Sequence, residues 1–283
     1  MHRWFKHILA FTAALIFLQL LASERSDAAI SVYPTFLFLT APSRAISISV
    51  TNSGMTQIEV WVDFRFGYPV TNDTGGVEMK YLDSSDVTEP MATGWIHAFP
   101  QRFVLAPQES QTVRIMISPP PALPSGEFWS RMLFHSFSKE EIDLKNKQKG
   151  GIRSGFRVLS NIDVPFHFRN GRVFTGVTFQ NVTAIPEKGS LKVITDVSRT
   201  GNASFWGIYK ITLRNAAGHI VLTQDKRIAV YKTIHLHSVI DVSTLQPGSY
   251  TVELELTSKR TDVRPEYILH TDPVKKSVPV TIS

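Results

Sequence analysis

The residues of this chain that could carry chemistry are histidines, carboxylates and basic side chains, and they match no catalytic motif. There is no Gly-x-Ser-x-Gly elbow, no phosphate-binding loop, no His-Glu-x-x-His and no cysteine. His235 and His237 lie two residues apart on an expected strand, so both point to one face and could hold a metal with a third ligand. The sequence offers no obvious third ligand, which favours two histidines on a strand face. We therefore expect no enzyme activity, no metal site and no cofactor.

The elements that position these side chains are short strands. Segments such as 45–50, 58–64 and 111–117 alternate between apolar and polar residues, and turn residues bound the runs. A period of two is typical of β-strands, and no long stretch of the mature chain shows helical spacing. The sequence therefore predicts an all-β protein built from immunoglobulin-like β-sandwiches.

A break near Asn170 and Gly171 divides these strands into two sets. Residues 29–170 form the expected N-terminal domain, and residues 171–283 form a second immunoglobulin-like domain of seven short strands. The expected strands of the second domain are 173–179, 191–197, 209–213, 220–223, 228–234, 250–256 and 278–282. The lysine-rich segment 139–151 ends in two glycines and is expected to be a loop between two strands of the first domain, either functional or only solvated.

The first 28 residues have the layout of a secretory signal peptide. Arg3 and Lys6 precede an apolar run at 8–22, and small residues at Ser26 and Ala28 suit cleavage before the next residue. The run is about 15 residues long, whereas a spanning helix needs roughly 20, although an uncleaved anchor is the alternative. We expect export to the periplasm and no membrane insertion after cleavage. The formal net charge of +6 comes without a dense basic tract, so nucleic acid is not an expected partner.

The segment 155–169 is the most informative for binding. Its even positions are nearly all apolar and its odd positions are mostly polar. The even positions are Phe156, Val158, Ser160, Ile162, Val164, Phe166 and Phe168. Such a strand is longer than the usual 5–6 residues, and Pro165 is confined to an edge, a bulge or a strand end. An edge strand with one apolar face is what β-strand addition requires. The alternative is that all these side chains pack in their own core; we expect this for Phe166 and Phe168, and a free strand for 156–162.

Four segments together resemble the periplasmic pilus and fimbrial chaperones, the PapD-like family, as a divergent member. Residues 29–34 are similar to the family's first strand, and 99–114 are similar to its P-x-R-x-x-L-x-P-G-x-x-Q-x-V-R segment, with Gln108 where glycine is usual. Residues 124–131 are similar to the P-x-G-E-Y-R-S-H run of divergent branches, and 164–169 to the end of the long G strand.

This resemblance implies a boomerang of two immunoglobulin-like domains. Such a chaperone donates its G strand to an incomplete pilin-like subunit, caps it and delivers it to an outer-membrane usher. The residues that the resemblance implies for subunit binding are Phe156, Val158, Ser160 and Ile162. Glu127 and Arg169 would form part of the charge link between the domains.

The chain departs from the family pattern in the cleft. The family's basic pair, which binds the carboxylate at the subunit's C-terminus, is replaced here by Phe36 and Pro165, and the nearest basic candidates are Arg131 and Arg157. Two other functions remain open: a structural or adhesive surface protein of two immunoglobulin-like domains, and a sugar-binding sandwich. The client, the usher and the oligomeric state cannot be derived from the sequence.

Overall fold

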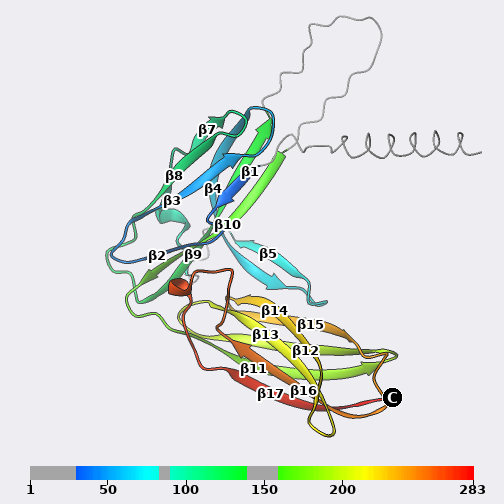
Figure 1. Cartoon of the computed structure of the whole chain (residues 1–283). Helices are drawn as coiled ribbons and strands as arrows, with labels where there is room; N and C mark the ends of the chain where they lie inside the picture. Colours follow the sequence, from blue (N-terminus) through cyan, green and yellow to red (C-terminus); the bar gives the residue numbers. More distant parts are fainter. Residues whose placement is uncertain (1–29, 83–89, 139–158) are drawn as a thin grey trace, which may run out of the picture.

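The computed structural model describes residues 30–82, 90–138 and 159–283, and it confirms an all-β fold (Figure 1). The strands of the first set are β1 (Ile30–Tyr33), β2 (Leu37–Thr40), β3 (Ala45–Asn52), β4 (Ile58–Thr71), β5 (Val77–Leu82), β6 (Ile96–Phe99), β7 (Arg102–Leu105), β8 (Ser110–Ile117), β9 (Gly126–Ser138) and β10 (Leu159–Asn170). Those of the second are β11 (Thr175–Glu187), β12 (Ser190–Gly201), β13 (Phe205–Asn215), β14 (Ile220–Val230), β15 (Thr233–Asp241), β16 (Gly248–Thr257) and β17 (Val274–Ile282). The two helices in these described ranges are single 3-10 turns, η1 (Thr93–Trp95) and η2 (Pro265–Tyr267). No helix among the described residues is long and apolar enough to span a bilayer.

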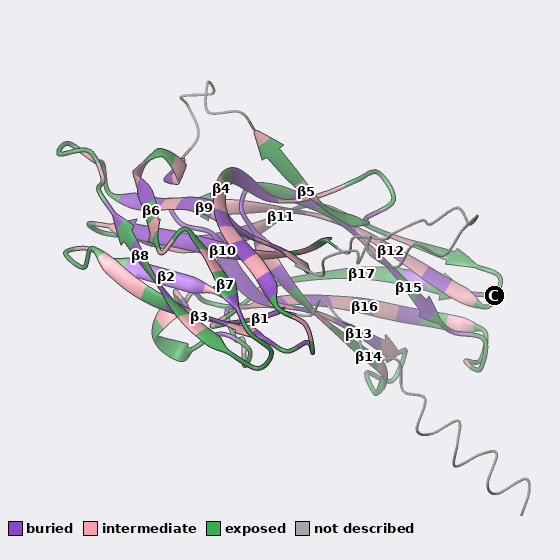
Figure 2. Cartoon of the chain, turned by 90° about the horizontal axis from the view of Figure 1, so that it is seen from above, coloured by how far each residue is buried: buried purple, intermediate pink, exposed green. Residues whose placement is uncertain are grey.

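The first sandwich packs a four-stranded sheet, in the order β1-β3-β8-β6, against a six-stranded sheet, in the order β2-β10-β9-β4-β5 with β7 beside β4. Because side chains alternate between the faces of a strand, each sheet turns one apolar row inward. Ile48 and Ile115 from one sheet share a buried core with Phe134 and Phe166 from the other. Figure 2 shows the buried residues within the strands and many exposed residues in the turns.

The second sandwich packs the sheet β11-β12-β15 against the sheet β14-β13-β16-β17. It has the seven strands that the sequence predicts, but two of them are divided differently. Residues 220–223 are in a strand as expected, but the expected break after them and the expected strand 228–234 are wrong. β14 runs unbroken through Ile220–Val230, and the chain turns at Tyr231 and Lys232 before β15. The polar residues 223–227 do not interrupt β14 because it is an edge strand, paired only with β13.

The two sandwiches meet at an angle (Figure 1), through a cluster of aromatic and apolar side chains at the junction. The rings of Trp129 and Tyr231 lie 5.2 Å apart edge to face, and those of Phe38 and Trp206 lie 5.6 Å apart in the same manner. Edge-to-face pairs at these separations add to the free energy of burial. The junction is therefore a packed core of its own, which holds one sandwich against the other.

Candidate functional site

One long edge of β10 is without a partner strand among the described residues. β10 pairs with β9 in antiparallel register over its whole length, from Leu159 to Asn170. On its other side β2 pairs only with the last part of β10, from Phe166 to Arg169. The stretch from Leu159 to Pro165 therefore forms a sheet edge within the described part of the chain.

The direction of the backbone groups follows from one hydrogen bond at the end of this strand. Ala41 N–H donates to the carbonyl oxygen of Arg169 at 2.9 Å, so the backbone groups of Arg169 point away from β9. The register with β9 has no bulge, and the groups alternate along a strand. Leu159, Asn161 and Asp163 therefore turn their N–H and C=O groups toward the open edge. Pro165 has the same orientation, so its missing N–H leaves the pairing with β9 intact.

The side chains of β10 change from exposed to buried along the strand. Leu159 is 54% exposed, Ser160 and Ile162 are half-buried, and Phe166 and Phe168 are 0% exposed. The expected home-core packing of Phe166 and Phe168 is confirmed. Ile162 also contacts that core, so it is less free than the sequence suggests. Phe156, Val158, Arg157, the loop 139–151 and the leader 1–28 lie outside the described residues.

Glu127 and Arg169 form a buried ion pair at the junction of the sandwiches. Glu127 on β9 accepts a hydrogen bond from Arg169 Nε at 2.8 Å, and its side chain is 0% exposed. Across the junction, the backbone N–H of Ser204 donates to Glu127 Oε1 at 3.1 Å, and its hydroxyl donates to the same oxygen. Arg169 Nη1 donates to the carbonyl oxygen of Tyr267 at 2.8 Å. Both members of the pair thus bond to the second sandwich.

His167 completes this network from the centre of the junction. Its Nδ1 lies 3.1 Å from Glu127 Oε1 and its Nε2 lies 3.0 Å from the Tyr231 hydroxyl. Burial lowers the pKa of His167 below its usual range, and the charge of Arg169 lowers it further. Burial alone would raise the pKa of Glu127, but His167, Arg169 and Ser204 lower it to about 2. We therefore treat Glu127 as ionised and His167 as neutral, donating from Nδ1 and accepting from Tyr231.

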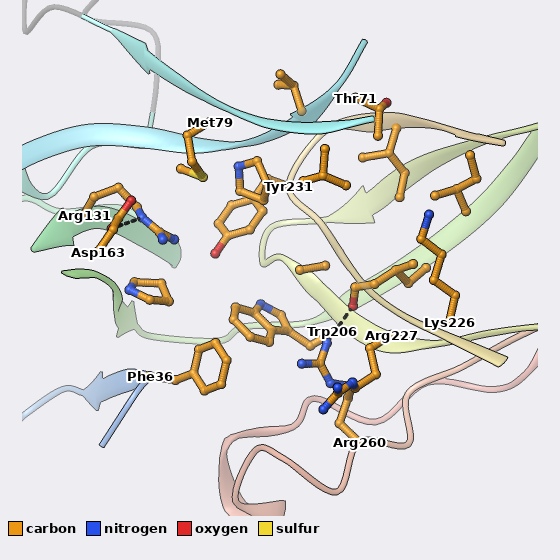
Figure 3. Close-up of a pocket in the computed structure, with 18 of the residues that line it drawn as sticks. Phe36, Thr71, Met79, Arg131, Asp163, Trp206, Lys226, Arg227, Tyr231 and Arg260 are labelled. Atoms are coloured by element: carbon orange, nitrogen blue, oxygen red, sulfur yellow. Dashed lines mark hydrogen bonds and ion pairs between the residues drawn. The ribbon is translucent and has the colours of Figure 1, made fainter. Parts of the chain in front are cut away.

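A cleft of about 440 Å³ lies between the sandwiches, beside the β10 edge. Its walls come from β10, from the β4–β5 hairpin and from β14 and β15. Figure 3 shows the rings of Phe36, Trp206 and Tyr231 at its centre, between the Arg131–Asp163 pair and a group of basic residues on the other side. Phe36 and Pro165, which the resemblance led us to expect in place of a basic pair, both line this cleft.

Arg131 is the described member of the two predicted carboxylate anchors. It lines the cleft, but its Nε donates to Asp163 Oδ1 at 2.7 Å. Asp163 also accepts a hydrogen bond from the Tyr81 hydroxyl at 2.7 Å, and burial, with Asp163, raises the pKa of Tyr81 to about 12. The charge of Arg131 is therefore already balanced inside the protein.

The two histidines that share a strand face lie on β15, as the sequence predicts, and not in the cleft wall. His235 Nδ1 lies 2.6 Å from Asp196 Oδ1, and the backbone N–H of His235 donates to Thr71 Oγ1 at 2.5 Å. No group of three or more potential metal ligands occurs in the ranges that the structure covers.

No family model and no curated protein matches the chain. Solved structures that match the chain include chaperones and chaperone–subunit complexes. A chaperone–tip adhesin complex of CFA/I fimbriae biogenesis has 14% identity and a TM-score of 0.41, over 90% of this chain and 99% of that one. The CsuC–CsuE chaperone–subunit complex of Acinetobacter baumannii has 12% identity and a TM-score of 0.43, over 88% and 98%. The CupB2 chaperone of Pseudomonas aeruginosa has 11% identity and a TM-score of 0.40, over 87% and 98%.

Sequence reasoning missed the contribution of the second sandwich to the cleft. Lys226, Arg227 and Arg260 line it, although no motif marks them. The only available signal was the basic run Lys226–Arg227 within an alternating segment, which is equally common on solvated strand faces. His167 was counted among the polar odd positions of its strand, yet it is buried.

Proposed function

We propose that this chain is a periplasmic chaperone that binds pilin-like or other secreted subunits through the open edge of β10. The observation that carries the proposal is that edge, where the backbone groups of Leu159, Asn161 and Asp163 have no strand partner among the described residues. An incomplete sandwich that lacks a strand could take up these groups as a ladder. The side chains that we propose for insertion into the subunit are Phe156, Val158, Ser160 and Ile162.

The remaining parts of the proposal follow from the position of that edge. We propose that residues 29–170 and 171–283 are separate domains, and that the Glu127–Arg169 pair holds them at the angle that aligns edge and cleft. The chain would enter the periplasm through its signal peptide, cap the subunit by binding without catalysis or a cofactor, and deliver it to an outer-membrane usher.

The experiment tests the backbone edge while leaving the fold intact. Asn161→Pro removes one outward N–H and places a ring where a partner strand would pair, whereas the ladder with β9 does not use that group. Asn161→Ala is the matched control, because it removes the same side chain and its hydrogen bond to His135 but keeps the N–H. Both variants should show the circular dichroism of a folded chain, and their free energies of unfolding in urea should agree within about 1 kcal/mol.

The readout is recovery of secreted subunits from periplasmic extract by the tagged full chain. We expect Asn161→Ala to recover a β-sandwich subunit in equimolar amount. Asn161→Pro should recover at least about tenfold less of that subunit than Asn161→Ala does. Equal recovery by the two folded variants would show that the β10 edge is not the binding site.

A further inference from the structure

The hairpin formed by β4 and β5 extends beyond the first sandwich. β4 pairs with β9 only as far as Arg65, and from Phe66 to Thr71 it pairs with β5 alone within the described part of the chain. Figure 1 shows this hairpin, in cyan, reaching from the first sandwich toward the second. A two-stranded hairpin is at best marginally stable by itself in water. The position of residues 66–82 must therefore depend on contacts with the rest of the protein.

The base of the hairpin is fixed at the junction of the sandwiches. Tyr68 on β4 is buried, and its ring stacks on that of Tyr231 with 6.2 Å between the centres. Lys232 Nζ lies 5.1 Å from the centre of the same Tyr68 ring. On β5, the Tyr81 hydroxyl donates to Asp163 at 2.7 Å. Both strands are therefore held close to the point where they leave the first sandwich.

The tip of the hairpin lies on the edge of β15. β15 pairs only with β12 among the described residues, and the backbone N–H of His235 donates to Thr71 Oγ1 on the hairpin at 2.5 Å. Gly75, in the turn, packs against His237: a methyl group at Gly75 would lie 2.7 Å from the backbone nitrogen and from the Cβ atom of His237. The tip thus contacts the second sandwich through a hydrogen bond and a close backbone approach, whereas the base is buried in the junction.

The turn at the tip is closed by the side chain of Asn72. Its Oδ1 accepts hydrogen bonds from the backbone N–H groups of Thr74 at 3.1 Å and Gly76 at 2.9 Å. The backbone N–H of Gly75 donates to the Asn72 carbonyl oxygen at 2.9 Å. Gly75 has a φ of +77°, in the left-handed region that glycine adopts without strain. A turn held by its own hydrogen bonds keeps its shape whether or not it touches β15.

We propose that the β4–β5 hairpin is a strap across the junction, with a fixed base and a tip that leaves β15 while both sandwiches stay folded. Local opening costs less free energy than unfolding where few contacts are lost. Thr71, Val77 and Met79 of the strap line the cleft together with Ile234 and Leu236 of β15, so release of the tip opens the cleft on this side. The closed tip also covers backbone groups of β15 that could pair with another strand. The inference does not rest on the proposed function, because the contact belongs to the chain without a partner.

The chain supplies a matched control for a change at the tip. Asn215 closes the turn between β13 and β14 in the same way, by accepting hydrogen bonds from two backbone N–H groups, and Gly218 in that turn has a φ of +82°. A methyl group at Gly75 would clash with His237, whereas one at Gly218 would meet nothing within 4 Å. Gly75→Ala and Gly218→Ala therefore impose a similar backbone strain, and only Gly75→Ala pushes a turn away from β15.

The first readout is the exchange of the His235 amide hydrogen with deuterium in the full chain, followed by NMR. We expect this amide to exchange at least about tenfold faster in Gly75→Ala than in Gly218→Ala. Thr71→Val removes the hydroxyl acceptor and should have the same effect without a clash, whereas Thr71→Ser keeps the hydroxyl and should exchange like the native chain. The amide of Val252, in the core of the second sandwich, should keep its exchange rate in all four variants.

The second readout is the distance between spin labels, which can be placed at will because the chain has no cysteine. Labels at Asp73→Cys in the tip and Lys188→Cys in the second sandwich, both exposed positions, report on the strap. Labels at Ser47→Cys and Lys188→Cys report on the two sandwiches. Gly75→Ala should lengthen and broaden the distances of the Asp73 pair, and leave those of the Ser47 pair unchanged.

Three outcomes would overturn the proposal. The first is equal exchange of the His235 amide in Gly75→Ala and Gly218→Ala, or native protection of that amide in Thr71→Val. The second is an Asp73–Lys188 distance that does not change in Gly75→Ala. The third is faster exchange of Val252, or a change in the Ser47–Lys188 distance, since the tip would then not open by itself.

Discussion

Replacement of Arg169 by Met tests whether the buried charge network holds the junction together. The change removes the guanidinium but keeps a side chain that can pack against Phe38, whose ring centre lies 4.7 Å from the Arg169 Cζ atom. It leaves the Glu127 carboxylate, which is 0% exposed, with only the Ser204 donors and His167. Breaking a buried pair from one side costs about 3–5 kcal/mol, and the lost bond to Tyr267 adds about 1 kcal/mol. We expect a loss of about 4–6 kcal/mol in the free energy of unfolding at pH 8.

The same variant should regain part of this loss at lower pH. Arg169 lowers the pKa of His167 in the native protein, so its removal raises that pKa and allows the imidazole to protonate beside Glu127. A protonated His167 replaces part of the missing charge. The deficit relative to the native chain should therefore be smaller at pH 6 than at pH 8.

Urea unfolding at the two pH values measures the deficit, and small-angle scattering measures the angle between the sandwiches. Arg172→Met is the control, because Arg172 is a nearby exposed arginine. The control should change the stability by less than about 0.5 kcal/mol. A deficit below about 1 kcal/mol for Arg169→Met at pH 8, a deficit that does not depend on pH, or an unchanged scattering profile would refute the role given to this pair.

Two further predictions concern single positions. His167 is neutral when buried but takes a proton when unfolded, so the unfolded state binds more protons below about pH 6.5 and the native chain loses stability as the pH falls from 7 to 5. In His167→Gln the urea midpoint should decline less over this pH range. A decline equal to that of the native chain would contradict the assignment of His167 as neutral. A methyl group at Gly207 would lie 2.2 Å from the Thr257 carbonyl oxygen and 2.5 Å from the Phe205 ring. Gly207→Ala should therefore destabilise the second sandwich by at least about 2 kcal/mol in thermal unfolding. Gly94→Ala is the control and should be close to neutral, because the methyl group added there meets nothing within 4 Å.

The strand content and the core of this protein could be predicted because they depend on local alternation. The alternating residues Ile48 and Val50 of segment 45–50, and Val113, Ile115 and Ile117 of segment 111–117, face inward as expected, and Phe166 and Phe168 are buried. The error at 228–234 arose because apolar residues continue on both sides of the turn at Tyr231 and Lys232, and neither glycine nor proline marks it.

The edge character of β10 was also available from the sequence, since Pro165 cannot donate to a ladder. Which edge is open, and how far, was not available. That depends on β2, whose pairing with β10 ends at Phe166 because the two strands run parallel over only four residues. The number of residues over which two strands pair depends on where distant segments pack. The apolar–polar alternation within one segment does not predict that number.

The sequence alone determined that the chain alternates into strands, that it has no catalytic motif, and that one long strand carries a proline near its middle, because these are properties of neighbouring residues. The tertiary structure decided the rest. It places Ser204 and Tyr231 on the Glu127–His167–Arg169 cluster, and it brings Lys226 and Arg227 to the cleft that Phe36 lines. These groups lie far apart in the chain, and their contact depends on the packing angle of two sandwiches, which no local pattern encodes.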